Sequence, residues 1–232
     1  MDERNEIILI DKPLKWTSFD VVNKVRWAGK YKKVGHAGTL DPLASGLVIV
    51  CTGKGTKKIE GLMGVDKEYT GTIGLGFTTP SYDLETEANA TFPTDHITNE
   101  LIFETAKSFL GPQMQIPPMF SALKVDGKKL YDLARKGQEI KIESRPIEIK
   151  EFEITGIRMP YVDFRVVVTK GTYIRSLAYD FGIACGSGGH LAGLRRTRVG
   201  DFHIQEAQTI EQWMDWWRER KALQQEMPQS LD

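Results

Sequence analysis

The residue with the clearest chemical potential is Asp41, which lies in a loop rich in glycine. The loop spans residues 35–46 and reads GHAGTLDPLASG. Its glycines allow backbone angles and close approaches that a β-carbon would prevent, and Pro42 disfavours helical geometry at Asp41. A carboxylic acid with the ordinary pKa of about 3.9 is ionised near neutrality, so it can act as a nucleophile without an activating base. The alternative interpretation is a solvated turn residue.

The elements around this loop are predicted from the spacing of apolar residues. Thr17 followed by Asp20 is a capping pattern that predicts a helix before the loop, and the apolar run 47–51 predicts a buried strand after it. The remaining pattern predicts strands over 6–10, 67–75 and 162–168, and helices over 99–110, 173–184 and 209–224. This mixture indicates an α+β fold built on a large mixed sheet.

The composition indicates a globular protein without a strong overall charge. The 232 residues are 41% hydrophobic, and 31 Lys and Arg balance 31 Asp and Glu. Any electrostatic binding of nucleic acid must therefore come from local basic clusters. The chain has two cysteines, and no apolar run approaches the roughly 20 residues of a membrane helix, so we expect a cytoplasmic protein without a disulfide scaffold.

Further strings of residues accompany the loop along most of the chain. They are DKP at 11–13, DKEY at 66–69, QIPPMFSALK at 115–124, KGTYIRSL at 170–177 and LRRT at 194–197. Together with the loop, and in the same order, they resemble the motifs of the pseudouridine synthases of the bacterial TruB type. Any single string is weak evidence, but coincidence does not explain the ordered set.

The resemblance implies the pseudouridine synthase fold, which is α+β with a large, mixed and mainly antiparallel sheet flanked by helices. It implies one catalytic domain over 1–232, with an inserted thumb at about 112–143 that clamps RNA, and without the C-terminal PUA domain of longer members. The insertion contains Phe120, Tyr131 and the basic residues Lys124, Lys128, Lys129, Arg135 and Lys136. Interleaved basic and aromatic side chains suit phosphate contacts and base stacking, whereas the alternative is a solvated amphipathic hairpin. The same two interpretations apply to the basic run 195–198.

The resemblance also implies a catalytic set. Asp41 corresponds to the nucleophile, and Arg175 pairs with it, which favours the ionised acid. Tyr69 stacks on the target base and is a candidate for removing the proton from C5 in the last step. Without the resemblance, a strand tyrosine packs in the core and a helix arginine forms a surface salt bridge. Whether Asp41 attacks C1′, attacks the uracil ring or removes a ribose proton is left open.

A second set is expected to contact the flipped uridine. By resemblance, Tyr173 and Leu194 line the uracil pocket together with Tyr69, and His36 fills the place that the flipped nucleotide leaves. Taken alone, Leu194 is more simply a core residue and His36 a solvated loop residue.

Lys12 and Asp83 complete the residues assigned to substrate binding. Lys12 lies in the DKP string, and Asp83 ends the string TPSYD. Pro80 occupies a position of that string where the family usually has Asp, so the supporting role of Asp83 is an open question. The scattered histidines and cysteines do not form a metal-binding pattern, and we expect neither a metal nor a cofactor.

The resemblance implies an isomerase that flips the T-loop uridine out of tRNA and converts it to pseudouridine. The expected partner is the T-arm of tRNA, with no membrane, no required protein partner and a monomeric state. The alternatives are an RNA-binding or tRNA-folding protein without catalysis, and a guide-dependent or differently targeted pseudouridine synthase. A hydrolase with an aspartate nucleophile is a further alternative, although no second acid lies near Asp41 to hold a metal.

Overall fold

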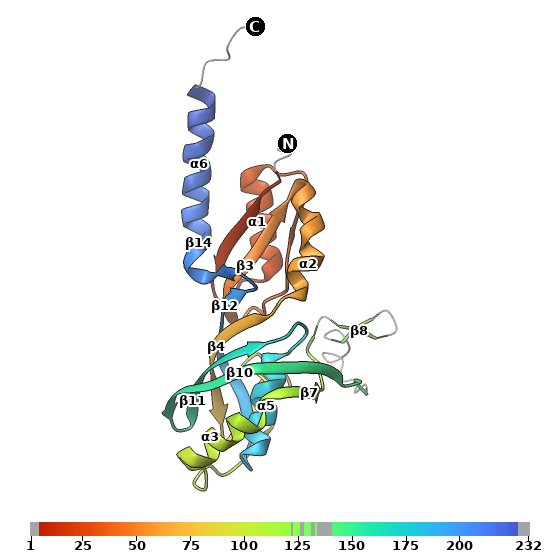
Figure 1. Cartoon of the computed structure of the whole chain (residues 1–232), viewed down its shortest axis with the longest axis vertical. Coiled ribbons are helices and arrows are strands. Elements are labelled where there is room, and N and C mark those ends of the chain that lie inside the picture. Colours follow the sequence, from red (N-terminus) through yellow and green to blue (C-terminus); the bar gives the residue numbers. More distant parts are fainter. Residues whose placement is uncertain (1–4, 122, 126–127, 131–132, 134–140, 227–232) are drawn as a thin grey trace. The chain divides into compact units, whose positions relative to one another are not determined.

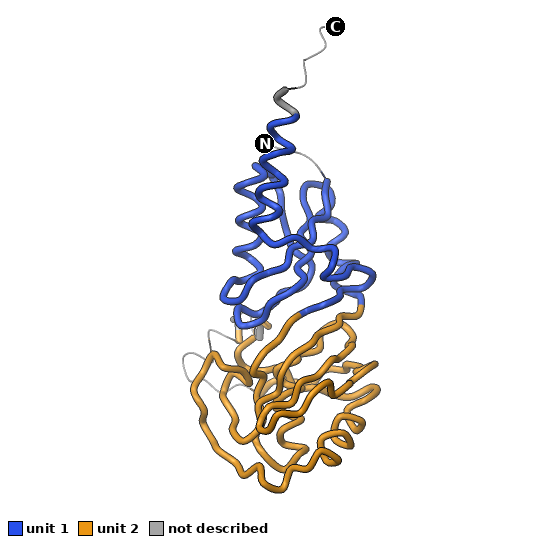
Figure 2. The backbone as a smooth tube through the Cα atoms, turned by 90° about the vertical axis from the view of Figure 1, so that its left-hand side faces the viewer, with its two compact units in different colours: residues 1–65, 196–232 blue, residues 66–195 orange. Residues whose placement is uncertain are grey.

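The chain divides into two compact units, which Figure 2 shows in blue and orange. The computed structural model describes residues 5–121, 123–125, 128–130, 133 and 141–226. Unit 1 contains residues 1–65 and 196–232, and unit 2 contains residues 66–195. Strand β12 (Gly189–Val199) is divided between the units after Arg195. The expectation of one catalytic domain over 1–232 stays a prediction.

Unit 1 combines strands with three α-helices and two 3-10 helices among its described residues. Its strands are β1 (Ile7–Lys12), β2 (Val34–His36), β3 (Ala44–Thr52), the last residues of β12, β13 (Phe202–His203) and β14 (Gln208–Thr209). Its helices are α1 (Ser18–Gly29), α2 (Ile59–Gly64), α6 (Ile210–Glu226) and the 3-10 helices η1 (Gly53–Lys58) and η2 (Ile204–Glu206).

Helix α1 begins where its capping residues predict. The Thr17 hydroxyl accepts a hydrogen bond from the Asp20 N–H (3.0 Å), and the Asp20 carboxylate accepts one from the Thr17 N–H (2.8 Å). These bonds satisfy two donors that a helix start leaves unpaired. Val21, Val22 and Val25 are buried along one face, so the predicted start of the helix is confirmed.

The core of unit 1 lies around β3. Leu47, Ile49 and Cys51 are completely buried and pack with Ala37 and Val199. The prediction of a buried strand over 47–51 is therefore confirmed, and the strand extends further at both ends.

Unit 2 contains most of the longer strands and two α-helices in its described part. Its strands are β4 (Lys67–Leu75), β5 (Phe77–Thr78), β6 (Ala90–Thr91), β7 (Gly111–Gln115), β8 (Lys124–Val125), β9 (Lys128–Lys129), β10 (Arg145–Arg158), β11 (Tyr161–Val168) and the first residues of β12. Its helices are α3 (Asn99–Ser108) and α5 (Ile174–Ala184).

Helix α3 ends earlier than its sequence pattern predicts. Thr98 caps its first turn, as expected, by accepting a hydrogen bond from the Leu101 N–H (3.2 Å). The helix stops at Ser108, however, and Leu110 is 47% exposed instead of lying on the apolar face. The N–H of Leu110 bonds to the Lys107 carbonyl, a contact three residues apart that tightens the last turn. No helix in the described ranges has the length and hydropathy needed to span a membrane.

In the described part of the chain the main sheet has ten strands and is mixed but mainly antiparallel. Figure 1 shows its longer strands as arrows. In unit 1 the order is β14-β1-β3-β12, with β2 on β3 and β13 on β12, and in unit 2 it is β12-β4-β11-β10-β7. The pair β1–β14 is parallel, whereas β1–β3, β4–β11, β10–β11 and β7–β10 are antiparallel. The α+β fold and the large mixed sheet flanked by helices are confirmed.

The first part of the predicted thumb belongs to the sheet. Residues 112–115 lie in β7, which pairs with β10, and β8 and β9 form a short hairpin. Tyr131, Arg135 and Lys136 lie outside the described residues. The role of the segment as an RNA clamp stays a prediction.

Candidate active site

The loop that carries Asp41 joins two paired strands of unit 1. β2 pairs with β3 on either side of the loop, and the Ala37 N–H continues the ladder with the Ile49 carbonyl (2.9 Å). The Ala44 N–H donates to the carbonyl of Asp41 (3.0 Å), which closes a turn. Asp41 is half-buried at this turn. Both ends of the loop are thus fixed by the sheet.

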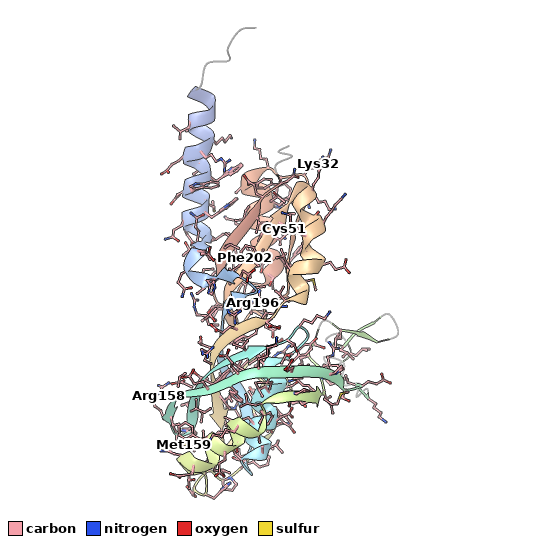
Figure 3. All side chains as sticks on the ribbon, in the orientation of Figure 1. Lys32, Cys51, Arg158, Met159, Arg196 and Phe202 are labelled. Carbon is pink, nitrogen blue, oxygen red and sulfur yellow. The ribbon has the colours of Figure 1, made fainter. Side chains whose placement is uncertain are left out.

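Arg196 holds the backbone of this loop through hydrogen bonds from its buried guanidinium. It is 1% exposed, and its guanidinium donates to the carbonyls of Leu47 (2.7 Å), Gly38 (3.1 Å) and Thr39 (3.5 Å). Figure 3 labels this side chain. Gly46 allows the approach, because its φ is 110° and a β-carbon there would lie 2.3 Å from the carbonyl oxygen of Arg196. One buried cation therefore satisfies two carbonyls of the loop, which lacks a strand partner there, and one carbonyl of the neighbouring strand β3.

The backbone on either side of Asp41 is held by the segment that begins α1. The Ser18 hydroxyl, 2% exposed, accepts from the Leu40 N–H (2.8 Å) and donates to the Leu40 carbonyl (3.2 Å). The Lys15 N–H donates to the Pro42 carbonyl (2.7 Å). The residues immediately before and after Asp41 are both fixed, so the direction in which its carboxylate leaves the loop is restricted.

Lys12 lies completely buried at the end of β1. Its ammonium donates to the carbonyls of Trp16 (2.6 Å) and Pro13 (3.0 Å). Burial lowers the pKa of Lys12 to about 8; the charge of Asp41 opposes this shift, and that of Arg196 adds to it. Two donors of Lys12 are thus occupied by its own turn. Its role in substrate binding stays a prediction.

His36 is the last residue of β2 and is half-buried. Burial lowers the pKa of the His36 imidazole; the Gly38 carbonyl opposes this shift, and the charge of Arg196 adds to it. The ring is consequently neutral at neutral pH. A neutral ring is better suited to stacking than to binding phosphate as a cation.

In unit 2, Arg175 lies against Asp83. Arg175, on α5, is 5% exposed; its Nη1 donates to the Ser81 carbonyl (3.2 Å), and its Nε lies 3.8 Å from Oδ2 of Asp83. Asp83 is equally buried, and its Oδ1 accepts from the Glu85 N–H (3.0 Å). Two predicted site residues are thereby brought together, and Pro80 does not prevent it. The predicted pairing of Arg175 with Asp41 stays a prediction.

The turn that carries Asp83 is held tightly. The hydroxyls of Thr79 (2.6 Å) and Ser81 (3.2 Å) both donate to the Asp83 carbonyl, and Tyr82 adopts a φ of 63°. The Leu191 N–H donates to the Tyr82 carbonyl (2.9 Å), which ties the turn to β12. A left-handed tyrosine costs free energy, so this network must offset it.

Three further predicted residues occupy regular elements of unit 2. Tyr69 lies on β4, opposite Val166 of β11, and is 8% exposed; Leu194 lies half-buried on β12. Tyr173 is the residue directly before α5. Its N–H donates to the side-chain amide of the buried Gln115 (2.7 Å), and its carbonyl accepts from that amide (3.1 Å). Their contact with uracil stays a prediction.

The sequence interpretation missed Arg196 and Gln115 as positioning residues. Both belong to strings that were recognised, LRRT and QIPPMFSALK, but neither was singled out. From the sequence, the run 195–198 is open to being an RNA contact or a solvated face, whereas Arg196 is buried in the structure. Within the described ranges, no group of three or more His, Cys, Asp or Glu side chains is arranged to hold a metal.

The comparisons with protein families cover nearly the whole chain. The model of the TruB family pseudouridylate synthase N-terminal domain matches residues 26–174, and that of the tRNA pseudouridylate synthase B C-terminal domain matches residues 175–231. The chain therefore belongs to the TruB family of pseudouridylate synthases.

Curated relatives agree with this assignment. A tRNA pseudouridine synthase B of Flavobacterium johnsoniae is 60% identical over 209 residues, which cover 87% of this chain and 91% of the relative. One of Phocaeicola vulgatus is 52% identical over 220 residues, which cover 92% and 94%.

Solved structures of related proteins share the fold. The chain matches a protein of a Cbf5-Nop10-Gar1 complex at 30% identity with a TM-score of 0.74, covering 94% of this chain and 57% of the other. It also matches a chain of an H/ACA RNP bound to a substrate RNA containing 2′-deoxyuridine, at 29% identity and a TM-score of 0.69, covering 93% and 55%. The chain thus spans slightly more than half the length of these structural relatives. The fold of the family is confirmed.

Proposed function

We propose that this protein flips the T-loop uridine at position 55 out of tRNA and isomerises it to pseudouridine, with Asp41 as the nucleophile. Membership of the TruB family makes the protein a pseudouridine synthase that acts on tRNA, which is an isomerase. The choice of uridine and the roles of the residues are the proposal. We further propose that it acts as a monomer in the cytoplasm, without a protein partner.

The observation that carries the role of Asp41 is the fixation of its neighbours. Leu40 is held by Ser18, Pro42 by the backbone of Lys15, and the preceding carbonyls by Arg196. A loop restrained in this way keeps one carboxylate in one orientation, which lowers the entropy cost of reaching the reacting atom. A solvated turn acid does not need such fixation.

The reaction requires no further reactant from the protein besides the nucleophile and groups that exchange protons. The bond between ribose C1′ and uracil N1 breaks, the base rotates, and C5 joins C1′; the proton on C5 leaves, and N1 takes up a proton. Neither water nor a redox partner is consumed, so an ionised Asp41 is sufficient to begin the reaction. Its first target, whether C1′, the uracil ring or a ribose proton, stays open.

The remaining residues support the extraction and binding of the base. Flipping a nucleotide costs a few kcal/mol, and we assign the neutral ring of His36 to the vacated place in the stack. Tyr69, Tyr173 and Leu194 are assigned to the uracil, with Tyr69 as the candidate acceptor of the C5 proton. Asp83 is assigned to the positioning of Arg175, because the two lie 3.8 Å apart and both are buried.

Tritium release from tRNA that carries [5-³H]uridine tests the proposal. Asp41→Asn should release tritium about 10³-fold more slowly or worse, because the amide is not a nucleophile. Asp201→Asn is a matched control, since Asp201 is an exposed acid of the same unit, and its activity should equal that of the wild type.

Three outcomes would contradict the proposal. Normal release by Asp41→Asn would remove the nucleophile, and tRNA binding by a wild-type protein that releases no tritium would favour the RNA-binding alternative. Release that persists when the T-loop uridine is replaced by cytidine would show a different target.

A further inference from the structure

Among the described arginines of unit 2, Arg145 differs in having no hydrogen bond or ion pair to another described residue. Arg165 pairs with Glu68, Glu151 and Glu153, and Arg158 pairs with Asp163. Arg145 is half-buried, yet in the described part of the chain its guanidinium forms neither a hydrogen bond nor an ion pair. Partial burial of an unpaired cation is unfavourable in the free protein, so this arrangement suggests that a ligand completes it.

The contact that Arg145 does make is with Tyr173. The guanidinium carbon lies 5.6 Å from the centre of the Tyr173 ring, which is within the range of a cation–π interaction. Such a contact covers one face of the guanidinium. It leaves the N–H groups at the rim available to an acceptor in the guanidinium plane.

The backbone segments that carry Arg145 and Tyr173 are held together by the sheet and by Gln115. Arg145 begins β10 and stands opposite Gln115 of β7 in the sheet. The side chain of Gln115 in turn bonds both the N–H and the carbonyl of Tyr173. Gly171, with a φ of 82°, turns the chain beside Arg145, and a β-carbon there would lie 3.9 Å from its Nη1. The relative position of Arg145 and Tyr173 is therefore set before any ligand arrives.

The surroundings of this pair favour an anion. Tyr173 precedes the first turn of α5, which contains no acidic residue and has no side-chain cap. The start of a helix carries a partial positive charge and favours negative groups. Lys170, an exposed cation, lies in the turn of the chain that precedes α5, three residues before Tyr173.

We propose that Arg145 binds a backbone phosphate of the RNA next to the flipped uridine, while the Tyr173 ring packs against that nucleotide. This inference rests on the proposed function, since it places Tyr173 at the target nucleotide. A planar guanidinium binds a phosphate through two parallel N–H bonds, which an ammonium does not reproduce. Arg145 is thus a binding residue, and it couples recognition of the backbone to the placement of the base.

The affinity for a T-arm stem-loop RNA at several salt concentrations tests the contact. Arg145→Met should weaken binding about 10-fold and reduce the slope of log K against log salt by about 1, as expected for one lost phosphate contact. Arg145→Lys should keep the slope and recover only part of the affinity. Arg158→Met is the matched control, because Arg158 ends the same strand with an exposed side chain (labelled in Figure 3) and should leave both quantities unchanged.

A second measurement locates the phosphate. Stem-loops with one neutral methylphosphonate on the 5′ or the 3′ side of the target uridine should bind the wild type more weakly at one of the two linkages. Arg145→Met should bind the stem-loop with that neutral linkage no more weakly than the wild type does. Thermal unfolding of each variant should match the wild type, since Arg145 forms no hydrogen bond or ion pair within the described residues.

Wild-type affinity and slope in Arg145→Met would overturn the inference, even if the kcat of this variant were reduced. Both measurements report binding alone. A wild type that binds the stem-loop but releases no tritium from tRNA would contradict the proposed function without deciding the phosphate contact.

Discussion

The two units hold their candidate site residues by different means. In unit 1, Asp41 lies on a loop whose backbone is fixed by side chains, above all by Arg196 and Ser18. In unit 2, Tyr69 and Arg175 lie on a strand and a helix, and side chains such as Asp83 act on other side chains. Regular elements satisfy their own backbone groups, whereas a loop depends on donors from elsewhere.

This difference predicts different consequences of mutation. Removal of a donor in unit 1 leaves buried carbonyls unpaired, which lowers stability and disorders the loop together. Removal of a partner in unit 2 leaves the helix or strand intact and disturbs one side chain. The first should therefore disorder the backbone of the loop, whereas the second should displace one functional side chain while the backbone around it stays ordered.

Among the changes that compare the two units, Arg196→Met is expected to have the largest effect. It leaves the carbonyls of Gly38, Thr39 and Leu47 without their donor, at about 1 kcal/mol or more each in the free energy of unfolding. Activity should fall about 10²-fold, because small misplacements of a reacting group are costly. Urea unfolding and tritium release measure the two effects.

Arg198→Met is the control for this change. Arg198 lies two residues further along β12 and donates to the Gly200 carbonyl. Arg198→Met should therefore lower stability and activity less than Arg196→Met does. Equal stability and activity of Arg196→Met and the wild type would show that the loop does not depend on its buried cation.

Asp83→Asn should have an intermediate effect on activity. The amide keeps the shape but removes the charge opposite Arg175, so kcat should fall about 10-fold, which corresponds to about 1.4 kcal/mol. The urea midpoint should fall as well, because both partners are buried and Arg175 keeps its charge. Asp163→Asn, which alters an acid of the same unit paired with the exposed Arg158, should keep full activity. Wild-type activity of Asp83→Asn would contradict the assignment of Asp83 to the positioning of Arg175.

The last expected effect concerns stability alone and is a pH dependence from Lys12. Its pKa is about 8 in the folded protein and about 10.4 in an unfolded chain. Between these values the unfolded state binds more protons, so the folded state gains stability as the pH rises. The urea midpoint of the wild type should therefore rise between pH 8 and pH 10 relative to that of Lys12→Met.

Lys24→Met controls for the removal of a lysine, because Lys24 is exposed on α1. The difference between this variant and the wild type should be the same at both pH values. A constant difference for Lys12→Met as well would contradict a lowered pKa.

Local features of the fold were predictable where neighbouring residues determine them. The capping pair Thr17 and Asp20 marked the start of α1, and the apolar run 47–51 marked the core of β3. The end of α3 was predicted two residues too late, because Leu110 continues the apolar pattern although the last turn tightens and exposes it. An apolar pattern indicates which face of a helix can be buried, but it does not fix where the helix ends.

The sequence by itself determined the family, several of the helices and strands, and the loop around Asp41, because ordered motifs and short-range spacing carry that information. Only the tertiary structure decided that Arg196 is buried under the loop, that Arg175 lies against Asp83, and that Arg145 lies beside Tyr173. Arg196 is separated along the chain by 149 residues from Leu47 and by 158 residues from Gly38. Charge and motif do not reveal which cation of a basic run is desolvated, since burial depends on the packing of distant segments.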